Sequence, residues 1–193
     1  MAKPVKPKSL KATVTHLEMR KPPRTAPPLP VNLHATLIRA TEIPLHFYRY
    51  LQWRVGREWH WVTRLRMKDQ ELAETIHAKT TRIYVLSVDG APAGFFELSS
   101  ARDANVELVY FGLMDHVRKR GLGEWMLGQA VATAWSLTPA SVTVQTNTLD
   151  HPAALPLYQR MGFTPVSQNE AIIRPLSDDE ILSMAKAGFP ENA

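Results

Sequence analysis

The sequence predicts a mixed α/β domain in which antiparallel strands precede a β-α-β unit. Residues 82–88 and 93–99 form two apolar, strand-like runs around Asp89-Gly90, a pattern typical of a β-hairpin. A third run, 106–113, is followed by a glycine-containing turn and a helix-like segment at 124–138. Residues 141–146 again carry alternating β-branched side chains. Strand, turn, helix and strand in this order indicate a β-α-β unit with a right-handed crossover.

The remaining elements are predicted from periodicity and capping signals. The sequence favours strands at 12–19 and 34–40, helices at 45–55 and 68–78, a short helix capped by Asp150 and ended by Gly162, and a last helix that begins at the capping box Ser177–Glu180 and stops at Gly188. We therefore expect three parts: a basic, proline-rich N-terminal segment (1–30, extended or flexible around the strand at 12–19), a main domain (31–175), and a C-terminal helix and tail (176–193).

Composition excludes several kinds of protein. The chain of 193 residues has 45% hydrophobic residues, enough for a core, and no cysteine, so disulfides, thiolate metal sites and cysteine nucleophiles are absent. No apolar run reaches the ~18 residues that a membrane span needs, and the lysine- and proline-rich start lacks a signal-peptide core. We expect a cytoplasmic protein that does not associate with membranes and contains no metal.

The positive charge is concentrated at the N-terminus. The net charge is +5, but residues 1–30 hold seven basic side chains and one acidic side chain, which leaves the rest close to neutral. Residues 21–30 include five prolines and are predicted to run extended. A basic arm could bind nucleic acid, but a solubilising terminus is the favoured interpretation, so nucleic acid is an unlikely partner.

Residues 117–123, Val-Arg-Lys-Arg-Gly-Leu-Gly, predict an anion site. A glycine turn between a strand and a helix lets the backbone approach a ligand closely. The unpaired N–H groups of the first helical turn, together with the helix dipole, favour a phosphate there. Neither the Walker loop nor the dinucleotide fingerprint fits, because the first is absent and the second requires Gly or Ala where Met126 stands.

Two motifs together make the chain similar to the GNAT superfamily of acyl-CoA-dependent N-acyltransferases, from about Val106 to Val166. Arg118-x-x-Gly121-x-Gly123 resembles the family's pyrophosphate loop. Leu157-Tyr158, followed by Met161-Gly162-Phe163, resembles its second motif. The resemblance implies acetyl-CoA as cosubstrate, an amine acceptor, and a sheet whose β-α-β strands splay apart around the coenzyme A arm. It also implies these cofactor-binding residues: Leu113, Arg118, Lys119, Arg120, Gly121, Leu122, Gly123, Glu124 and Asn147.

The chain departs from the family pattern at two positions in the second motif. Many members carry Asn where this chain has His151, and that Asn helps to hold the pantetheine arm, so Asn147 is named as a substitute. Pro156 falls inside the Tyr-bearing helix, where it removes a backbone hydrogen bond and is expected to bend or shorten the first turn.

An N-acyltransferase needs a base, because an ammonium has no lone pair with which to attack a thioester. Glu107 is the first candidate: it lies eleven residues before Arg118, where related enzymes place a catalytic glutamate. Glu97, on the neighbouring strand, is the rival. Tyr158 is the expected general acid for the departing thiolate, as in the family. His116 and His151 could also act as bases by their pKa, but for His116, at the rim before the loop, a surface role is favoured.

Residues 46–61 are rich in rings, and three explanations of them stay open. They include His46, Phe47, Tyr48, Tyr50, Trp53, Trp59, His60 and Trp61. An aromatic acceptor pocket, core packing and a homodimer contact would each account for them.

The leading function is an acetyl-CoA-dependent N-acetyltransferase. The alternatives are a GNAT-fold module that binds acyl-CoA without turnover, a nucleic-acid binder, and a nucleotide-phosphate binder unrelated to coenzyme A.

Overall fold

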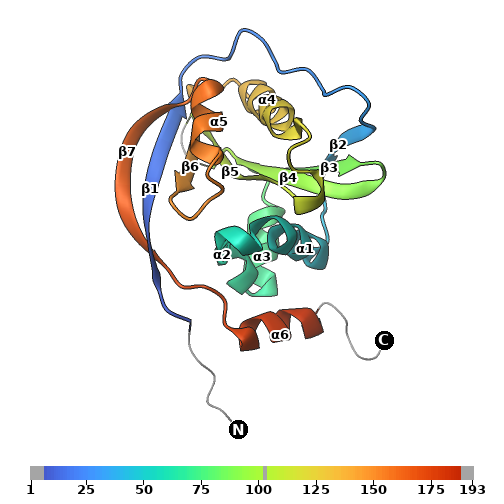
Figure 1. Cartoon of the computed structure of the whole chain (residues 1–193), viewed down its shortest axis with the longest axis vertical. Helices are drawn as coiled ribbons and strands as arrows, with labels where there is room; N and C mark the ends of the chain where they lie inside the picture. The colour runs from blue at the N-terminus through green and yellow to red at the C-terminus, as the bar shows by residue number, and fades with distance from the viewer. Residues whose placement is uncertain (1–6, 102–103, 188–193) are drawn as a thin grey trace.

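The computed structural model describes residues 7–101 and 104–187, in which seven strands form one mixed sheet (Figure 1). The strand order is β2-β3-β4-β5-β6-β1-β7. The strands are β1 (Leu10–Met19), β2 (Ala35–Ala40), β3 (Thr81–Val88), β4 (Ala91–Ser99), β5 (Asn105–Leu113), β6 (Ser141–Asn147) and β7 (Thr164–Ile173). Only β5 and β6 pair in parallel; all other neighbours in this part of the chain are antiparallel. The mixed α/β fold predicted from the sequence is confirmed.

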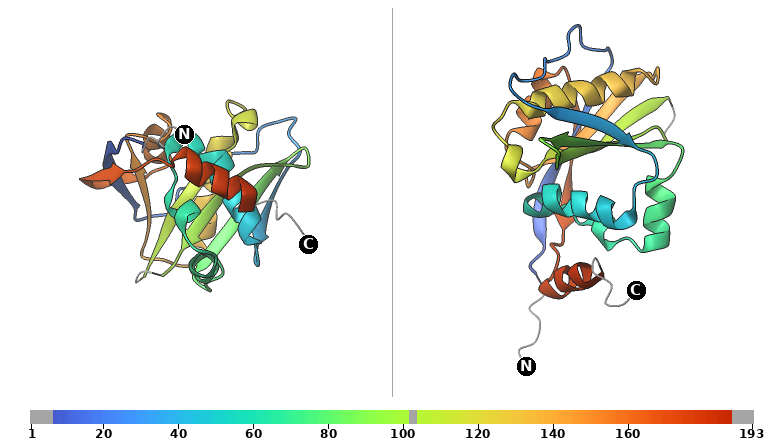
Figure 2. Two further views of the ribbon diagram at one scale, coloured as in Figure 1. Left: turned by 90° about the horizontal axis from the view of Figure 1, so that it is seen from below. Right: turned by 90° about the vertical axis from the view of Figure 1, so that its right-hand side faces the viewer.

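The helices cover both faces of the sheet. They are α1 (Leu45–Gly56), η1 (Arg57–Trp59), α2 (Thr63–Arg66), α3 (Asp69–Ile76), η2 (Asp115–Val117), α4 (Leu122–Trp135), α5 (Ala154–Arg160) and α6 (Asp178–Ala187). The helices α1 to α3 pack on one face and α4 and α5 on the other, as the two perpendicular views show (Figure 2). Each face of the sheet therefore has its own buried hydrophobic cluster.

The hairpin predicted around Asp89-Gly90 is confirmed. Both residues have positive φ, 50° and 82°, and Val88 pairs with Ala91, so the turn has two residues. Asp-Gly suits such a turn because both central residues must enter the left-handed region.

Strand β1 occupies an unexpected position. The sequence predicted a strand at 12–19, and the structure extends it to Leu10–Met19. It lies between β6 and β7, antiparallel to both, and thus far from the antiparallel strands β2 to β4 (Figure 1). The strand that comes first in the sequence therefore pairs with two strands from the C-terminal half of the chain. Residues 10–19 belong to the main sheet, whereas the proposed domain boundary at residue 30 stays a prediction.

The proline-rich stretch after β1 crosses over α4 on its way to β2 (Figures 1 and 2). A Cβ at Gly128, in the middle of α4, would lie 2.6 Å from Cδ of Pro27. Glycine is unfavourable inside a helix, but here it leaves the space that the crossing chain fills. The predicted lack of regular structure at residues 21–30 is confirmed, and the chain bends at Lys21, Arg24 and Thr25, whereas its extended course stays a prediction.

Two local expectations were wrong and one lies partly outside the described residues. Asp150 does not cap α5: the N-cap is Ala153, and the Asp150 carboxylate instead accepts hydrogen bonds from Thr146 Oγ1 and Asn147 N. Pro156 does not disturb α5, because it falls in the first turn, where the backbone N–H has no helical partner. The capping box of α6 is confirmed by reciprocal bonds between Ser177 and Glu180, whereas its predicted stop at Gly188 lies outside the described residues.

Candidate active site

The sheet opens between β5 and β6. Their parallel pairing covers only Asn105–Leu108 against Ser141–Val144. Beyond Leu108, β5 continues to Leu113 and β6 to Asn147, and no ladder joins these two ends. The pairing of β5 with β4 shifts by one residue after Leu108, so Val109 is a bulge residue. A bulge turns the strand, and it here coincides with the start of the gap.

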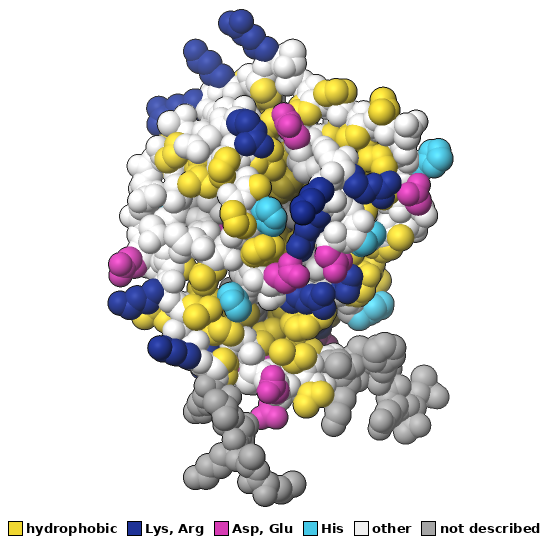
Figure 3. Space-filling view, viewed as in Figure 1, with side chains coloured by type: hydrophobic (Ala, Val, Ile, Leu, Met, Phe, Trp, Pro, Cys, Tyr) yellow, Lys and Arg dark blue, Asp and Glu magenta, His cyan; other side chains and the backbone are white. Residues whose placement is uncertain are grey.

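The gap is part of a cleft of about 1210 Å³. Residues 108–113 form one side of it and Val144, Gln145 and Asn147 the other. The turn before α4 and the first residues of α5 complete the wall on one face, and residues 59–63 line it on the opposite face. The space-filling view shows Lys, Arg, Asp, Glu and His side chains gathered near the middle of the face that the cleft enters (Figure 3).

The turn before α4 has the geometry of an anion site. Gly121 has φ +77° and precedes the first helical residue, and no side chain caps the helix. The N–H groups of the first turn therefore have no side-chain acceptor. A Cβ at Gly123 would be in ordinary contact, 3.9 Å from side-chain atoms of Leu113 and Leu157. Packing within the protein thus does not require this glycine, and its missing Cβ leaves room in the cleft.

Eight of the nine predicted cofactor-binding residues line this cleft, and Arg120 does not. The Arg120 guanidinium lies 3.9 Å from the carboxylate of Asp89, at the hairpin turn. Asn147 lines the cleft, but its amide serves the turn after β6: its Oδ1 accepts from Leu149 N at 2.8 Å, and its Nδ2 donates to Asp150 at 3.3 Å. His151, where relatives carry Asn, also serves this turn by accepting from Ala153 N.

Tyr158 of α5 lines the same cleft. Its ring is 95% buried and packs edge-on against Phe111 and Phe163, with centroids 6.3 and 5.9 Å away. No side chain or backbone group of residues 7–101 and 104–187 hydrogen-bonds its hydroxyl. Burial, and then the negative charge of Asp150, raise the pKa of this phenol, so it is protonated at neutral pH. The hydroxyl is a proton donor without a partner in this part of the protein.

A splayed strand pair beside an uncapped glycine turn is the arrangement that the two sequence motifs predicted. The sequence model of the family described as "Acetyltransferase (GNAT) domain" matches residues 60–172, more than half of the chain. The chain belongs to the GNAT acetyltransferase family. A search of curated proteins gives no significant match.

Solved structures show the same fold at low sequence identity. An IAA acetyltransferase from Bacillus cereus has a TM-score of 0.53 at 21% identity, with 69% of this chain and 79% of that one covered. A GCN5-related N-acetyltransferase from Sphaerobacter thermophilus gives 0.57 at 16%, covering 90% and 53%. A Staphylococcus epidermidis protein described as functionally unknown gives 0.54 at 12%, covering 86% and 62%. The chain spans less than two thirds of the last two proteins.

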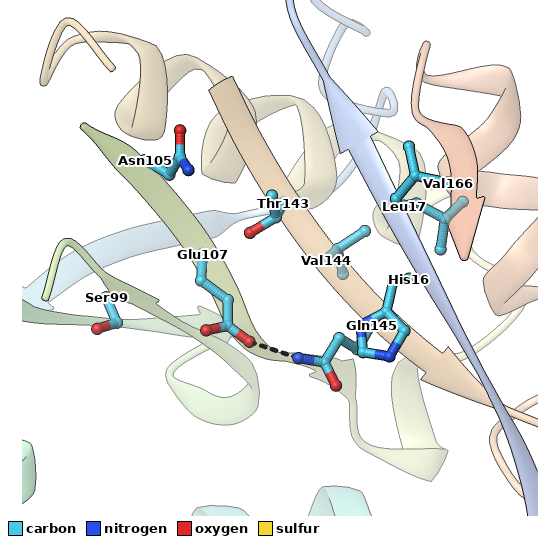
Figure 4. A pocket seen from close by; sticks show the side chains of 9 residues that line it. All are labelled: His16, Leu17, Ser99, Asn105, Glu107, Thr143, Val144, Gln145 and Val166. Atoms are coloured by element: carbon cyan, nitrogen blue, oxygen red, sulfur yellow. Dashed lines mark hydrogen bonds between the residues drawn. The ribbon is translucent and has the colours of Figure 1, made fainter. Parts of the chain in front are cut away.

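Of the two glutamates considered as bases in this GNAT domain, Glu107 lies beside the cleft. It lines a smaller cavity of about 240 Å³, where its Oε1 accepts from Gln145 Nε2 at 3.1 Å. Figure 4 shows these side chains pointing toward one another from β5 and β6, with His16 of β1 nearby. Val144 and Gln145 line both cavities, so the Gln145 side chain bonded to Glu107 lies at the boundary between the two.

Glu97 is held inside the protein instead. It is fully buried, its Oε1 accepts from Arg64 Nη2 at 2.7 Å, and its Oε2 accepts from the Tyr48 hydroxyl. Gln52 donates in turn to Tyr48. Burial, and then the charge of Glu97, raise the pKa of Tyr48 and keep it a donor. Both carboxylate oxygens are thus occupied, and the network joins β4 to α1 and α2.

The ring-rich stretch divides between core and cleft. Tyr48 is buried, whereas Trp59, His60 and Trp61 line the cleft. Trp61 donates from Nε1 to Asp150 at 3.3 Å, and its ring lies 5.1 Å from that of Tyr110. Burial raises the pKa of Tyr110 to about 12, and the charge of Glu97 adds to this. The many aromatic residues of 46–61 indicated core packing, an acceptor pocket or a dimer contact. The sequence could not show which of these rings are buried in the core and which line the cleft.

Sequence reasoning missed Glu58, Asp150 and Arg66 as parts of the cleft region. Glu58 pairs with Arg118, and Asp150 joins the turn after β6 to Trp61. Arg66 lines the cleft and binds Glu180 and the carbonyls of Arg174 and Pro175, which fixes α6 to α2. No motif marks these residues, because the partners named here are 60 or more positions away in the sequence.

Two further observations concern metals and membranes. Within the described ranges, no group of three or more His, Asp or Glu side chains is arranged to hold a metal ion. Among the helices of the same ranges, none is long and apolar enough to cross a bilayer.

His116, also considered as a base, lies at the rim of the cleft. Its side chain is 45% exposed and does not line the cleft.

Proposed function

We propose that this GNAT protein is an acetyl-CoA-dependent N-acetyltransferase that transfers the acetyl group directly to a primary amine. Family membership supports acyltransferase activity. The observation that carries the proposal is the stretch of β5 beyond Leu108, which pairs with β4 but not with β6 and lies between the uncapped turn of α4 and Tyr158. An extended ligand with phosphate groups at one end and a thioester at the other would fit this arrangement, with the phosphates at the turn of α4, the arm along β5 and the thioester near Tyr158.

In this mechanism the phosphates are held at the start of α4. The helix dipole, the free N–H groups of the first turn and Arg118 all favour negative charge there. The pantetheine arm would hydrogen-bond to the free edge of β5, as an added strand does. The thioester carbonyl would then lie near the bulge at Val109, where backbone N–H groups can stabilise the oxyanion formed on attack.

Glu107 is proposed to deprotonate the acceptor ammonium through a bridging water. The water is needed because Gln145 lies between Glu107 and the cleft. The neutral amine attacks the thioester carbon, the C–S bond breaks as the tetrahedral intermediate collapses, and the thiolate takes the proton of Tyr158. The remaining extra proton on the acylated nitrogen then passes through water to the Tyr158 phenolate, which restores the phenol and leaves a neutral amide. The raised pKa of Tyr158 ensures that this proton is present at neutral pH. Glu97 is not used, because both of its oxygens are already bonded.

The second candidate is a GNAT-fold module that binds acyl-CoA without turnover. The position of Glu107 outside the main cleft favours it, since a base that cannot reach the amine would leave only binding. Changing Glu107 to Gln distinguishes the two candidates: the enzyme should lose most activity at unchanged acetyl-CoA affinity, whereas a binding module has no activity to lose.

The deciding experiment is calorimetric titration of the protein with acetyl-CoA, together with an Arg118→Glu, Gly121→Asp double variant. We expect micromolar binding that the variant loses, after which amine acceptors are screened by the release of free thiol. Absence of binding at hundreds of micromolar would overturn the proposal. Binding without thiol release from any amine would favour the non-catalytic module.

The cytoplasmic location, the homodimer and the lack of nucleic-acid and metal partners stay predictions. Among them, nucleic-acid binding has the simplest test. A basic arm would give binding that weakens steeply with salt and disappears when residues 1–30 are deleted. Because β1 lies inside that deletion, substitution of the basic residues outside β1 is the better variant.

A further inference from the structure

Residues 57–61, which join α1 to α2, form a bridge across the cleft. The bridge contains η1, which is followed by His60 in the left-handed region with a φ of 56° and then by Trp61. Glu58 contacts the turn before α4 on one side of the cleft, and Trp59 and Trp61 contact the turn after β6 on the other. Those two turns are the ones between which the cofactor is proposed to enter.

The contact on the α4 side is an ion pair. Arg118 Nη1 lies 2.6 Å from Glu58 Oε2, and the Arg118 guanidinium lies 5.5 Å from the centre of the Trp59 ring. The side chains are 25% and 45% exposed, so the pair is partly solvated. Such partly exposed pairs contribute little to stability, and a ligand can replace them.

The contacts on the α5 side hold the other end of the bridge. The ring of Trp59 meets that of His151 edge-on at 5.1 Å. Trp61 donates to Asp150, and its position leaves no space for a Cβ at Gly56, which would lie 2.4 Å from Trp61 Cβ. The bridge is therefore anchored at Trp61, while Glu58 and Trp59 rest on groups at the cleft surface.

We propose that Glu58 is an internal competitor of the cofactor: it occupies Arg118 in the free protein and must release it when the cofactor's diphosphate binds. This inference rests on the proposed function, because it assumes that Arg118 receives phosphate. A diphosphate can bond to Arg118 and to the free N–H groups of α4 together, whereas among residues 7–101 and 104–187 the Glu58 carboxylate is bonded only to Arg118. The ligand therefore wins the competition, at reduced affinity.

Glu58 lies outside the part of the chain that the family model matches. The family match begins at His60, so Glu58 and Trp59 lie just before it, while Arg118 lies within it. The acid is thus supplied from outside the part of the chain that the family pattern describes. Once released, Glu58 remains near the phosphates and repels them, so its carboxylate should lower affinity in both states.

The test is calorimetric titration of acetyl-CoA into the wild type and Glu58→Gln. The glutamine keeps the size of the side chain and removes its charge. We expect the Kd to fall about three- to tenfold, the size expected when a weak ion pair and a like charge are removed. Glu42→Gln is the matched control: it removes one negative charge at an exposed site outside the cleft, and its Kd should match the wild type.

A double-mutant cycle with Arg118→Gln shows whether Glu58 acts through Arg118. In the Arg118→Gln background, the further change Glu58→Gln should tighten binding clearly less than in the wild-type background, because only the repulsion between Glu58 and the phosphates is then removed. Equal tightening in both backgrounds would mean a general charge effect, which overturns the inference. An unchanged or larger Kd for Glu58→Gln in the wild-type background would overturn it as well.

Failure of this inference can be told apart from failure of the proposed function. If the wild type does not bind acetyl-CoA at all, the proposed function fails. If it binds and Glu58→Gln does not tighten the complex, only the competition is wrong. Because Glu58 is exposed, the variant should fold, and thermal melting without ligand verifies this.

Discussion

The two walls of the cleft are built in different ways. The cofactor wall, residues 113–124, depends on backbone conformation: a glycine with φ +77° and a helix start without a side-chain cap. The facing wall, residues 57–66, depends on side chains: Glu58 on Arg118, Trp61 on Asp150, and Arg64 on the buried Glu97. One wall is a short continuous segment, while the other is held by partners far away in the sequence.

Because of this difference, substitutions in the two walls should affect different properties: cofactor affinity in one wall and the stability of the fold in the other. Changes on the cofactor wall should act on the cofactor with moderate effects on folding. Changes to the Arg64–Glu97 pair should act mainly on folding, because it lies inside the protein and joins β4 to α2. The following predictions test that division.

The largest effect is expected on the facing wall. Arg64→Ala leaves the Glu97 carboxylate buried without its partner, which should lower the free energy of unfolding by about 3–5 kcal/mol. Urea denaturation measures the change. Arg39→Ala, on the exposed side of β2, is the control and should stay within about 0.5 kcal/mol of the wild type. A similarly small change for Arg64→Ala would mean that the buried pair does not hold the wall.

Tyr158→Phe tests the proton donor in isolation. The ring keeps its packing against Phe111 and Phe163, so folding should be unchanged. The rate of thiol release should fall about a hundredfold, the lower end for loss of a general acid, because a thiolate is already a fair leaving group. Acetyl-CoA affinity should change less than twofold. An unchanged rate would exclude Tyr158 as the acid.

Gly121→Ala and Gly123→Ala are a matched pair on the cofactor wall. At Gly121, alanine is forced into the left-handed region and its Cβ comes within 3.1 Å of Pro30, which should cost about 1–2 kcal/mol of stability. At Gly123, the Cβ makes only ordinary contacts, so stability should be kept while the added methyl group weakens acetyl-CoA binding. Equal losses of stability would show that the backbone geometry does not distinguish the two positions. Unfolding curves and titration give both quantities.

The smallest effect is expected at α6 and depends on pH. The hydrogen bond from Arg66, and then that from Ser177 N, lower the pKa of Glu180 to about 2. Its folded pKa is below the unfolded value of about 4.3, so its stabilising contribution is complete above that value and is lost as the pH falls toward 2. Glu180→Gln should be less stable than the wild type at pH 7 by up to about 1 kcal/mol. The difference should vanish near pH 2, as measured by unfolding at each pH.

Much of the fold could be predicted because its signals are local. The hairpin at Asp89-Gly90, the turn at Gly121 and the capping box at Ser177 each need only neighbouring residues, and all three are present. The position of β1 could not be predicted. Its alternation indicates a strand, but pairing with both β6 and β7 depends on residues about 130–160 positions later. Strand β7 itself was missed, since its mostly exposed residues lack an apolar pattern.

The residues of the candidate site likewise fall into those that the sequence predicts and those that depend on distant partners. The glycines and basic residues of the loop before α4 follow from sequence because the chemistry lies within one turn. The ion pair of Glu58 with Arg118 and the burial of Glu97 depend on how α1 and α2 pack onto the sheet. Glu97 illustrates the limit: a charged residue among apolar neighbours required an explanation, and its partner Arg64 is 33 residues away.

The placement of β1 also bears on the order in which the chain can fold as it leaves the ribosome. This strand is made before its two neighbours, β6 and β7, which end at Asn147 and Ile173. Residues 10–19 must therefore wait for these partners while the residues up to Ile173 are synthesised. At about 5–20 residues per second, that delay lasts many seconds. The lysines and prolines on either side of β1 then have a use before folding, since charge and proline discourage a waiting strand from pairing with other chains.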